Sequence, residues 1–144
     1  MNKLGIFVAA VVVALGGFWI TQDSSAAPSH LPNAAVAAGA LASVIVPDQL
    51  SDNAAIGKRA FEANCAACHA VNAAGQDGVA PPLIHKIYEP SHHGDESFQR
   101  AVALGVRSHH WPFGDMPAVD GVGRADVTYI IAYIRELQRA NGIQ

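Results

Sequence analysis

Two cysteines and a histidine lie within five residues, in the string Cys65-Ala66-Ala67-Cys68-His69. They are the only two cysteines among the 144 residues of the chain. Thiols at this spacing can form a disulfide, half a zinc site, a redox pair or a covalent attachment to a cofactor. Structural zinc needs a second pair of ligands, and the sequence has no second cysteine pair. A thioredoxin-type redox pair needs a βαβ context, which the residues around Cys65 do not indicate.

The histidine that follows the second cysteine favours one of these alternatives. Cys-x-x-Cys-His is the attachment signature of c-type haem. Cys65 and Cys68, three residues apart on a helical turn, can reach the two vinyl groups of a haem and form thioethers. His69 then lies beneath the iron and supplies the proximal imidazole. The expected cofactor is one haem c, bound covalently through two thioethers.

Helices are expected to position this motif. The spacing of apolar residues predicts helices over Ser51–Asn64, over Asp95–Leu104 and from Arg124 to about Gly142. Gly105 can end the second helix in a left-handed conformation, which glycine adopts at low cost. Gly123 can cap the third helix, although it is a weaker cap than Ser or Thr.

In this order, the motif and the helices resemble the class I (mitochondrial-type) c-type cytochromes, here as a bacterial exported monohaem member. The resemblance covers about residues 48–144. It implies an all-α fold in which a few helices wrap around one covalently bound haem. It also implies that Gly57 lets the C-terminal helix cross closely, with Phe61 and Tyr133 packed nearby.

The resemblance assigns further residues to the haem. The family has a Pro-x-Leu after the motif, and its proline carbonyl accepts a hydrogen bond from the proximal histidine. Pro81 in the string Pro81-Pro82-Leu83 is the better match to that proline. The family also places a methionine ligand before the last helix, often followed by proline. Met116-Pro117 matches, and Met116 is the only methionine besides the initiator. A lone methionine is usually a core filler, but this position predicts a His/Met iron site.

Two histidine pairs, His92-His93 and His109-His110, flank the second expected helix. They can lie in solvated loops or bind haem propionates, form a second site for copper or zinc, or replace Met116 on the iron. No carboxylate or cysteine stands beside them at metal-ligand spacing, which favours the first interpretation. Trp111 follows the second pair and can line the haem crevice, donating its N–H to a propionate.

The N-terminus indicates export. Residues 4–20 form an uncharged apolar run, either an export signal cut after Ala26 or a membrane anchor. The expected organisation is a signal peptide or anchor over 1–26, an Ala/Pro-rich linker over 27–47 and a haem domain over 48–144. The linker is expected to carry a short helix that lies on the domain, or an apolar patch for a partner. The expected location is periplasmic or exported, either free or tethered to the inner membrane through the apolar run.

The charge balance limits the classes of partner that the chain is expected to bind. Lys+Arg number 9 against 12 Asp+Glu, and the formal net charge is −3. This balance argues against nucleic acid as a partner, because binding the phosphate backbone needs a basic surface. Lys58 and Lys86 are the only lysines in the haem domain. A ring of lysines for docking is therefore not expected, and redox partner proteins would meet a small apolar contact around the haem edge.

The expected function is one-electron transfer. No Ser/His/Asp or paired-carboxylate arrangement indicates independent catalysis, so the chain is expected to be a carrier and not an enzyme. Two alternatives stay open. One is a fixed cytochrome subunit of a membrane or copper-containing oxidase or dehydrogenase. The other is a haem sensor or peroxidase, which requires Met116 to dissociate from the iron.

Overall fold

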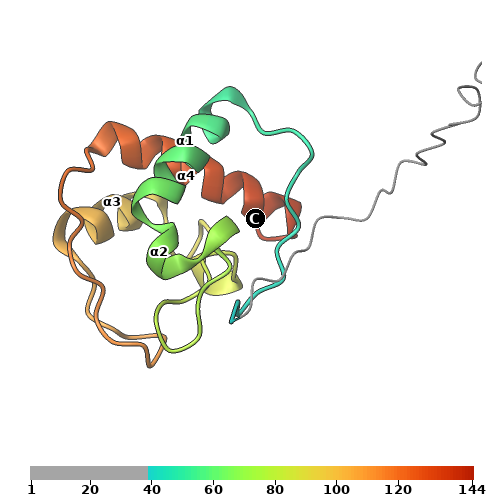
Figure 1. The fold of residues 1–144 in the computed structure, drawn as a ribbon. Helices are drawn as coiled ribbons and strands as arrows, with labels where there is room; N and C mark the ends of the chain where they lie inside the picture. Colours follow the sequence, from blue (N-terminus) through green and yellow to red (C-terminus); the bar gives the residue numbers. More distant parts are fainter. Residues whose placement is uncertain (1–38) are drawn as a thin grey trace, which may run out of the picture. The chain divides into compact units, whose positions relative to one another are not determined.

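The regular secondary structure of the protein is helical. The computed structural model describes residues 39–144, and within them no strand forms beyond isolated β-bridges. An all-α fold is therefore confirmed for this part of the chain. The elements shown in Figure 1 are α1 (Asp52–Asn64), α2 (Ala66–His69), the 3₁₀ turns η1 (Val71–Ala73) and η2 (Lys86–Tyr88), α3 (Asp95–Leu104) and α4 (Arg124–Ala140).

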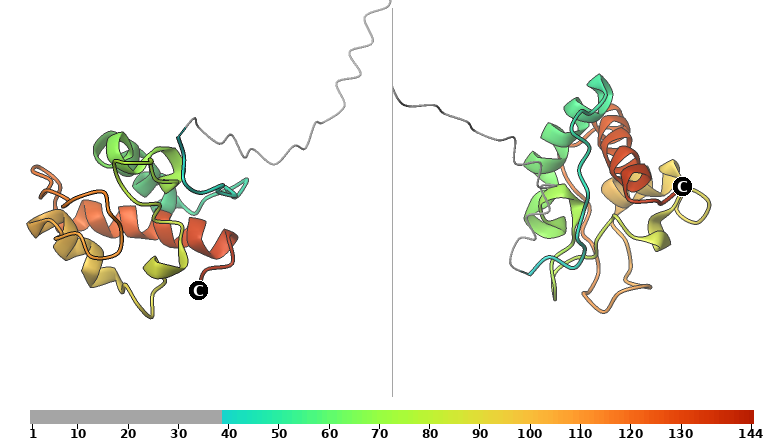
Figure 2. Two further views of the ribbon diagram at one scale, coloured as in Figure 1. Left: turned by 90° about the horizontal axis from the view of Figure 1, so that it is seen from below. Right: turned by 90° about the vertical axis from the view of Figure 1, so that its right-hand side faces the viewer.

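Helices α1 and α4 cross, as Figures 1 and 2 show, and Gly57 of α1 lies against Tyr129 and Ile130 of α4. A Cβ atom at Gly57 would lie 1.8 Å from the carbonyl oxygen of Tyr129, so only glycine permits this crossing. Ser51 caps α1 by accepting a hydrogen bond from the backbone N–H of Ala54 (3.3 Å). The Ser51 hydroxyl also donates to the Glu136 carboxylate on α4 (3.0 Å). The start of α1 is thereby tied to the helix that it crosses.

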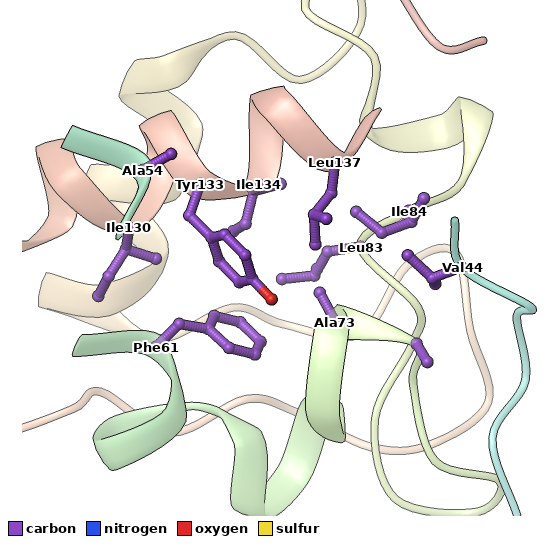
Figure 3. Close-up of a cluster of buried hydrophobic side chains, with 11 residues drawn as sticks. Val44, Ala54, Phe61, Ala73, Leu83, Ile84, Ile130, Tyr133, Ile134 and Leu137 are labelled. Atoms are coloured by element: carbon purple, nitrogen blue, oxygen red, sulfur yellow. The ribbon is translucent and has the colours of Figure 1, made fainter. Parts of the chain in front are cut away.

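The main hydrophobic core lies where α1, α4 and the segments after the motif meet (Figure 3). The Phe61 and Tyr133 side chains are fully buried, and their ring centroids are 5.8 Å apart. The Tyr133 hydroxyl donates to the side-chain oxygen of Asn72 (3.1 Å). The predicted packing of Phe61 and Tyr133 near the helix crossing is confirmed. The core consists of Val44, Ala54, Phe61, Ala73, Ala74, Leu83, Ile84, Ile130, Tyr133, Ile134 and Leu137.

The other two helix predictions agree closely with the structure. Helix α3 has the predicted bounds, and Gly105 follows it with a φ of +73°. Helix α4 begins after Gly123, whose N–H donates to the Asp126 carboxylate (3.0 Å), and ends at Ala140, two residues before Gly142. A smaller core of Val102, Val127 and Ile131 joins α3 to α4.

The segment before α1 differs from the expectation. Residues 39–46 contain no helix, so the predicted short helix is wrong for this part of the linker, and residues 34–38 lie outside the described residues. The Ala42 N–H donates to the carbonyl of Ala74 (2.9 Å). Further along the segment, the Asn141 side-chain amide pairs with the backbone (2.8 and 2.9 Å). These tertiary hydrogen bonds hold the segment in a non-helical conformation, and Val44, Ile45 and Val46 favour a helix less than alanine does.

The predicted signal or anchor over residues 1–26 lies outside the described residues. Within residues 39–144, none of the helices has the length and apolar character needed to cross a membrane.

Candidate functional site

All six residues predicted to bind the cofactor line one cavity. The cavity has a volume of about 550 Å³, and most of its surface is apolar. Its wall includes helix residues from α1, α2, α3 and α4 and the segment between α3 and α4. The predicted residues on its wall are Cys65, Cys68, His69, Pro81, Trp111 and Met116.

The two thiols lie where α1 gives way to α2. The Cys65 N–H ends α1 with a hydrogen bond to the carbonyl of Phe61 (2.8 Å), and the His69 N–H bonds back to the carbonyl of Cys65 (2.9 Å). This turn places Cys65 half-buried and Cys68 exposed, with neither in a disulfide. Burial, and secondarily the neighbouring Cys68, raises the pKa of the Cys65 thiol to about 11.

His69 is buried and its orientation is fixed. Its Nδ1 atom lies 2.9 Å from the carbonyl oxygen of Pro81, the hydrogen bond that the sequence predicts. A carbonyl only accepts, so Nδ1 carries the proton and the lone pair of Nε2 is free. Burial lowers the pKa of His69, while the hydrogen bond to Pro81 opposes that shift. The imidazole is thus held in the neutral form that binds a metal.

The loop between the motif and Pro81 is tightly packed. The N–H of Gly75 donates to the carbonyl of His69 (2.8 Å). A Cβ at Gly75 would lie 2.3 Å from the backbone nitrogen of Pro82, and Gly75 has a φ of +74°. Only glycine therefore lets the chain return close enough to bring Pro81 to the imidazole.

Met116 reaches the same cavity from the segment that joins α3 to α4. Its backbone pairs with Val106 through two hydrogen bonds, both 2.9 Å long. A Cβ at Gly105 would lie 2.5 Å from the carbonyl oxygen of Met116. The end of α3 and these two hydrogen bonds therefore fix the backbone position of Met116.

Trp111 offers a donor that has no well-placed acceptor. The Trp111 Nε1 atom is buried and forms no hydrogen bond of normal geometry among the described residues. Burial raises the pKa of Tyr88 to about 12, and a weaker interaction with the Trp111 side chain opposes that rise. The indole packs edge-on against His85 and stacks on Phe113, with ring centroids 5.3 and 5.7 Å away. Leaving a buried N–H unpaired costs about 1–3 kcal/mol, so an acceptor bound in the cavity would stabilise it.

The structure brings the two histidine pairs together at the rim of the cavity. The His110 ring centroid lies 5.5 Å from that of His92 and 5.3 Å from that of His93. The rings of His109 and His110 are 4.2 Å apart. Desolvation, and then the neighbouring histidines, lowers the pKa of His110. Spacing along the sequence could not show this convergence, because the pairs lie on opposite ends of α3.

Two polar residues of α4 have a structural role that the sequence analysis missed. The buried Arg135 guanidinium donates to the Asp95 carboxylate (2.9 Å) and to the carbonyl of Tyr88 (2.7 Å). The buried Gln138 amide donates to the carbonyl of Leu83 (2.9 Å). Together they fasten the backbone between the Pro-x-Leu string and α3, and with it one wall of the cavity.

A sequence signal for these two residues exists. Arg135 lies four residues after Ile131, and Gln138 lies four residues after Ile134. Residues four apart share a helix face, so both polar side chains lie on the face that is otherwise apolar. A polar residue on a buried face needs partners, and here the partners are backbone carbonyls.

Comparison with known protein families identifies the family of the chain. Residues 54–138, well over half of the chain, match the family model described as Cytochrome c. The chain belongs to the cytochrome c family. Members of this family bind haem c covalently, which agrees with the Cys-x-x-Cys-His arrangement, and the family supports a haem-binding role in electron transfer. A search of curated proteins found no match to this cytochrome c.

The cavity of this cytochrome c fits haem c. Two thiols, one neutral imidazole and one thioether border a mainly apolar space. The unpaired Trp111 N–H supplies a donor for a carboxylate, which haem carries as propionate groups. Each chemical feature of the cofactor thus has a counterpart among the lining residues.

Proposed function

We propose that this cytochrome c is an exported one-electron carrier with a single haem c and His/Met axial ligation. Cys65 and Cys68 form the thioethers, and His69 and Met116 bind the iron. The observation that carries this proposal is that His69 and Met116 line one cavity and come from separate segments. Each is held by hydrogen bonds of its own: His69 through its ring to a carbonyl, and Met116 through its backbone.

Each side chain has its own proposed role toward the haem. When bound, haem supplies an iron that gains or loses one electron. His69 would bind the iron through the lone pair of Nε2, because its Nδ1–H donates a hydrogen bond to the Pro81 carbonyl. Met116 would hold the iron through its thioether, which favours the reduced state and would leave no room there for a substrate. Trp111 donates its N–H to a propionate. An iron held by both His69 and Met116 would favour carrying electrons over catalysis.

Partners are proposed to be redox proteins that meet the cavity mouth. Cys68 is exposed, which supports a haem edge reachable from solvent near the attachment motif. The net charge of −3 and the two lysines of the domain support a contact with little electrostatic steering. The apolar run over residues 4–20 supports export, with the protein either cut free or tethered to the membrane.

The test is the visible spectrum of the ferrous protein before and after carbon monoxide is added. The protein must be produced with its haem-attachment machinery. Wild type is expected to keep a low-spin spectrum, because Met116 occupies the sixth position. Met116→Ala is expected to retain attached haem and to shift rapidly to a carbonmonoxy spectrum. A rapid shift in wild type would contradict the carrier proposal and favour a sensor or peroxidase.

The proposed location has its own test. N-terminal sequencing of the protein from the periplasmic and membrane fractions distinguishes the two forms. A mature N-terminus at Ala27 in the soluble periplasmic fraction supports a cleaved signal. An intact N-terminus in the membrane fraction supports an anchor, and co-purification with a large complex would support a fixed subunit. Recovery of the protein only in the cytoplasm would contradict export.

A further inference from the structure

Three histidines outside the attachment motif converge on one point. His92, His93 and His110 each place one potential ligand nitrogen within 4.8 Å of the others. The first two precede α3 and the third follows it, so helix α3 and its two connections bring the side chains together. His92 and His110 are exposed, while His93 is half-buried.

The inner histidine of this group is already oriented. The Nδ1 atom of His93 lies 2.6 Å from the carbonyl oxygen of Ile87. Because a carbonyl accepts, Nδ1 carries the proton and Nε2 has a free lone pair. The buried Arg135 also donates to the carbonyl of His93, which fixes the backbone. A histidine whose second nitrogen bonds to a carbonyl is the usual arrangement of a metal ligand.

We propose that His92, His93 and His110 bind one Zn²⁺ or Cu²⁺ ion at the rim of the cavity. Imidazole suits both ions, and three histidines that leave one position open form a recurrent zinc site. Two nitrogens on one ion, each at about 2.0–2.1 Å, lie at most about 4.2 Å apart. Small rotations of the two exposed side chains therefore close the site.

His109 provides a matched control. Its ring lies 4.2 Å from that of His110 and it is equally exposed, but it is not one of the three converging residues. Its Nδ1 lies 2.8 Å from the carbonyl oxygen of Arg107. Replacing it removes one imidazole from the same loop and leaves the proposed ligand set intact.

The experiment titrates Zn²⁺ into the full-length holoprotein, purified without a histidine tag and stripped with a chelator. Competition with a chromophoric chelator gives the affinity, and elemental analysis gives the zinc-to-iron ratio. Wild type is expected to bind one zinc per haem. His110→Ala and His92→Ala are each expected to lose affinity by at least about tenfold, the lower bound for disturbing a metal shell. His109→Ala is expected to keep the wild-type affinity and stoichiometry.

The same titration followed with Cu²⁺ gives a second readout. The EPR spectrum of bound Cu²⁺ is expected to show coupling to imidazole nitrogens in wild type and to change in His110→Ala. The haem absorption spectrum of each variant checks that the cavity is intact. No stoichiometric binding by wild type would overturn the proposal and leave the histidines as propionate partners or solvated side chains. Equal zinc affinity of His110→Ala and wild type would also overturn it.

Discussion

The two walls of the cavity that carry His69 and Met116 are built differently. His69 lies on a helical turn backed by the main core, where Phe61 and Tyr133 are fully buried. Met116 lies on a connection whose position depends on its backbone pairing with Val106 and on close contact with Gly105. Damage on the histidine side should therefore reduce the stability of the fold. Damage on the methionine side should first release the proposed Met116 ligand and leave the haem attached.

The largest expected effect is at the helix crossing. In Gly57→Ala, the new methyl group would lie 1.8 Å from a backbone carbonyl oxygen of α4, which forces the helices apart. We expect the free energy of unfolding of the holoprotein to fall by about 3 kcal/mol, measured by guanidinium denaturation.

Gly94→Ala is the control for this substitution. A Cβ at Gly94 would meet its nearest atom at 3.6 Å, an ordinary contact. The expected loss is below about 1 kcal/mol, in the range of a changed helix cap. Similar losses for the two glycines would show that the crossing does not depend on close backbone approach.

The second-largest effect is expected at the buried Arg135, which holds one wall of the cavity. Arg135→Met keeps an apolar stem but removes the hydrogen bonds to Asp95 and to the carbonyls of Tyr88 and His93. We expect a loss of about 2 kcal/mol in the free energy of unfolding, because the carbonyls lose charged donors. Arg124→Met breaks an exposed ion pair with Glu96 and should cost clearly less, because solvent screens this pair. Losses in the reverse order would contradict a structural role for the buried arginine.

The third prediction separates ligation from stability. Gly105→Ala would strain a residue at φ +73° by about 1–3 kcal/mol and would push against the Met116 carbonyl, 2.5 Å away. Gly114→Ala also has a positive φ, +91°, but meets nothing within 4 Å. The ferrous Gly105→Ala protein should therefore bind carbon monoxide faster than the Gly114→Ala protein. Equal rates would mean that Gly105 does not position the methionine.

The smallest effect is at the core tyrosine. Tyr133→Phe loses the hydrogen bond to Asn72 and should cost about 1 kcal/mol near neutral pH. Burial, and then the Glu62 charge, raises the pKa of Tyr133 from 10.0 to about 12. The protonated phenol therefore stabilises the fold below pH 10, and this contribution is lost as the pH rises from 10 through 12. The free energy of unfolding of wild type should fall more steeply with pH than that of Tyr133→Phe across this range. Identical slopes would contradict a raised pKa of Tyr133 in the folded protein.

The helices and the surroundings of His69 were the parts best predicted from the sequence. Apolar spacing predicted the bounds of α3, because Phe98, Ala101 and Val102 recur at helical intervals. Gly57 and Pro81 were identified through the family resemblance, and each has the close contact that the resemblance implies. These features depend on local patterns or on a motif with a fixed spacing.

The features that the sequence analysis missed depend on distant contacts. Residues 39–46 form no helix because hydrogen bonds to Ala74 and Asn141 hold them, and helix propensity does not report such contacts. The place of Arg135 on an apolar helix face indicates that it needs partners, but not that these partners are the backbone carbonyls before α3. The histidine pairs meet only because both connections of α3 fold toward the same rim. In each case the deciding partner lies far away in the chain.

The most direct test of the central claim, that His69 and Met116 bind the same iron, is NMR of the ferrous holoprotein labelled with ¹³C-methyl methionine. The chain contains only Met1 and Met116, so the Met116 methyl signal can be assigned by comparison with Met116→Ala. A methyl group held over the haem face experiences the ring current of the macrocycle. The proposed ligation predicts a Met116 methyl signal shifted far upfield of the normal methionine range. A Met116 methyl signal within the normal range in the ferrous protein would contradict His/Met ligation.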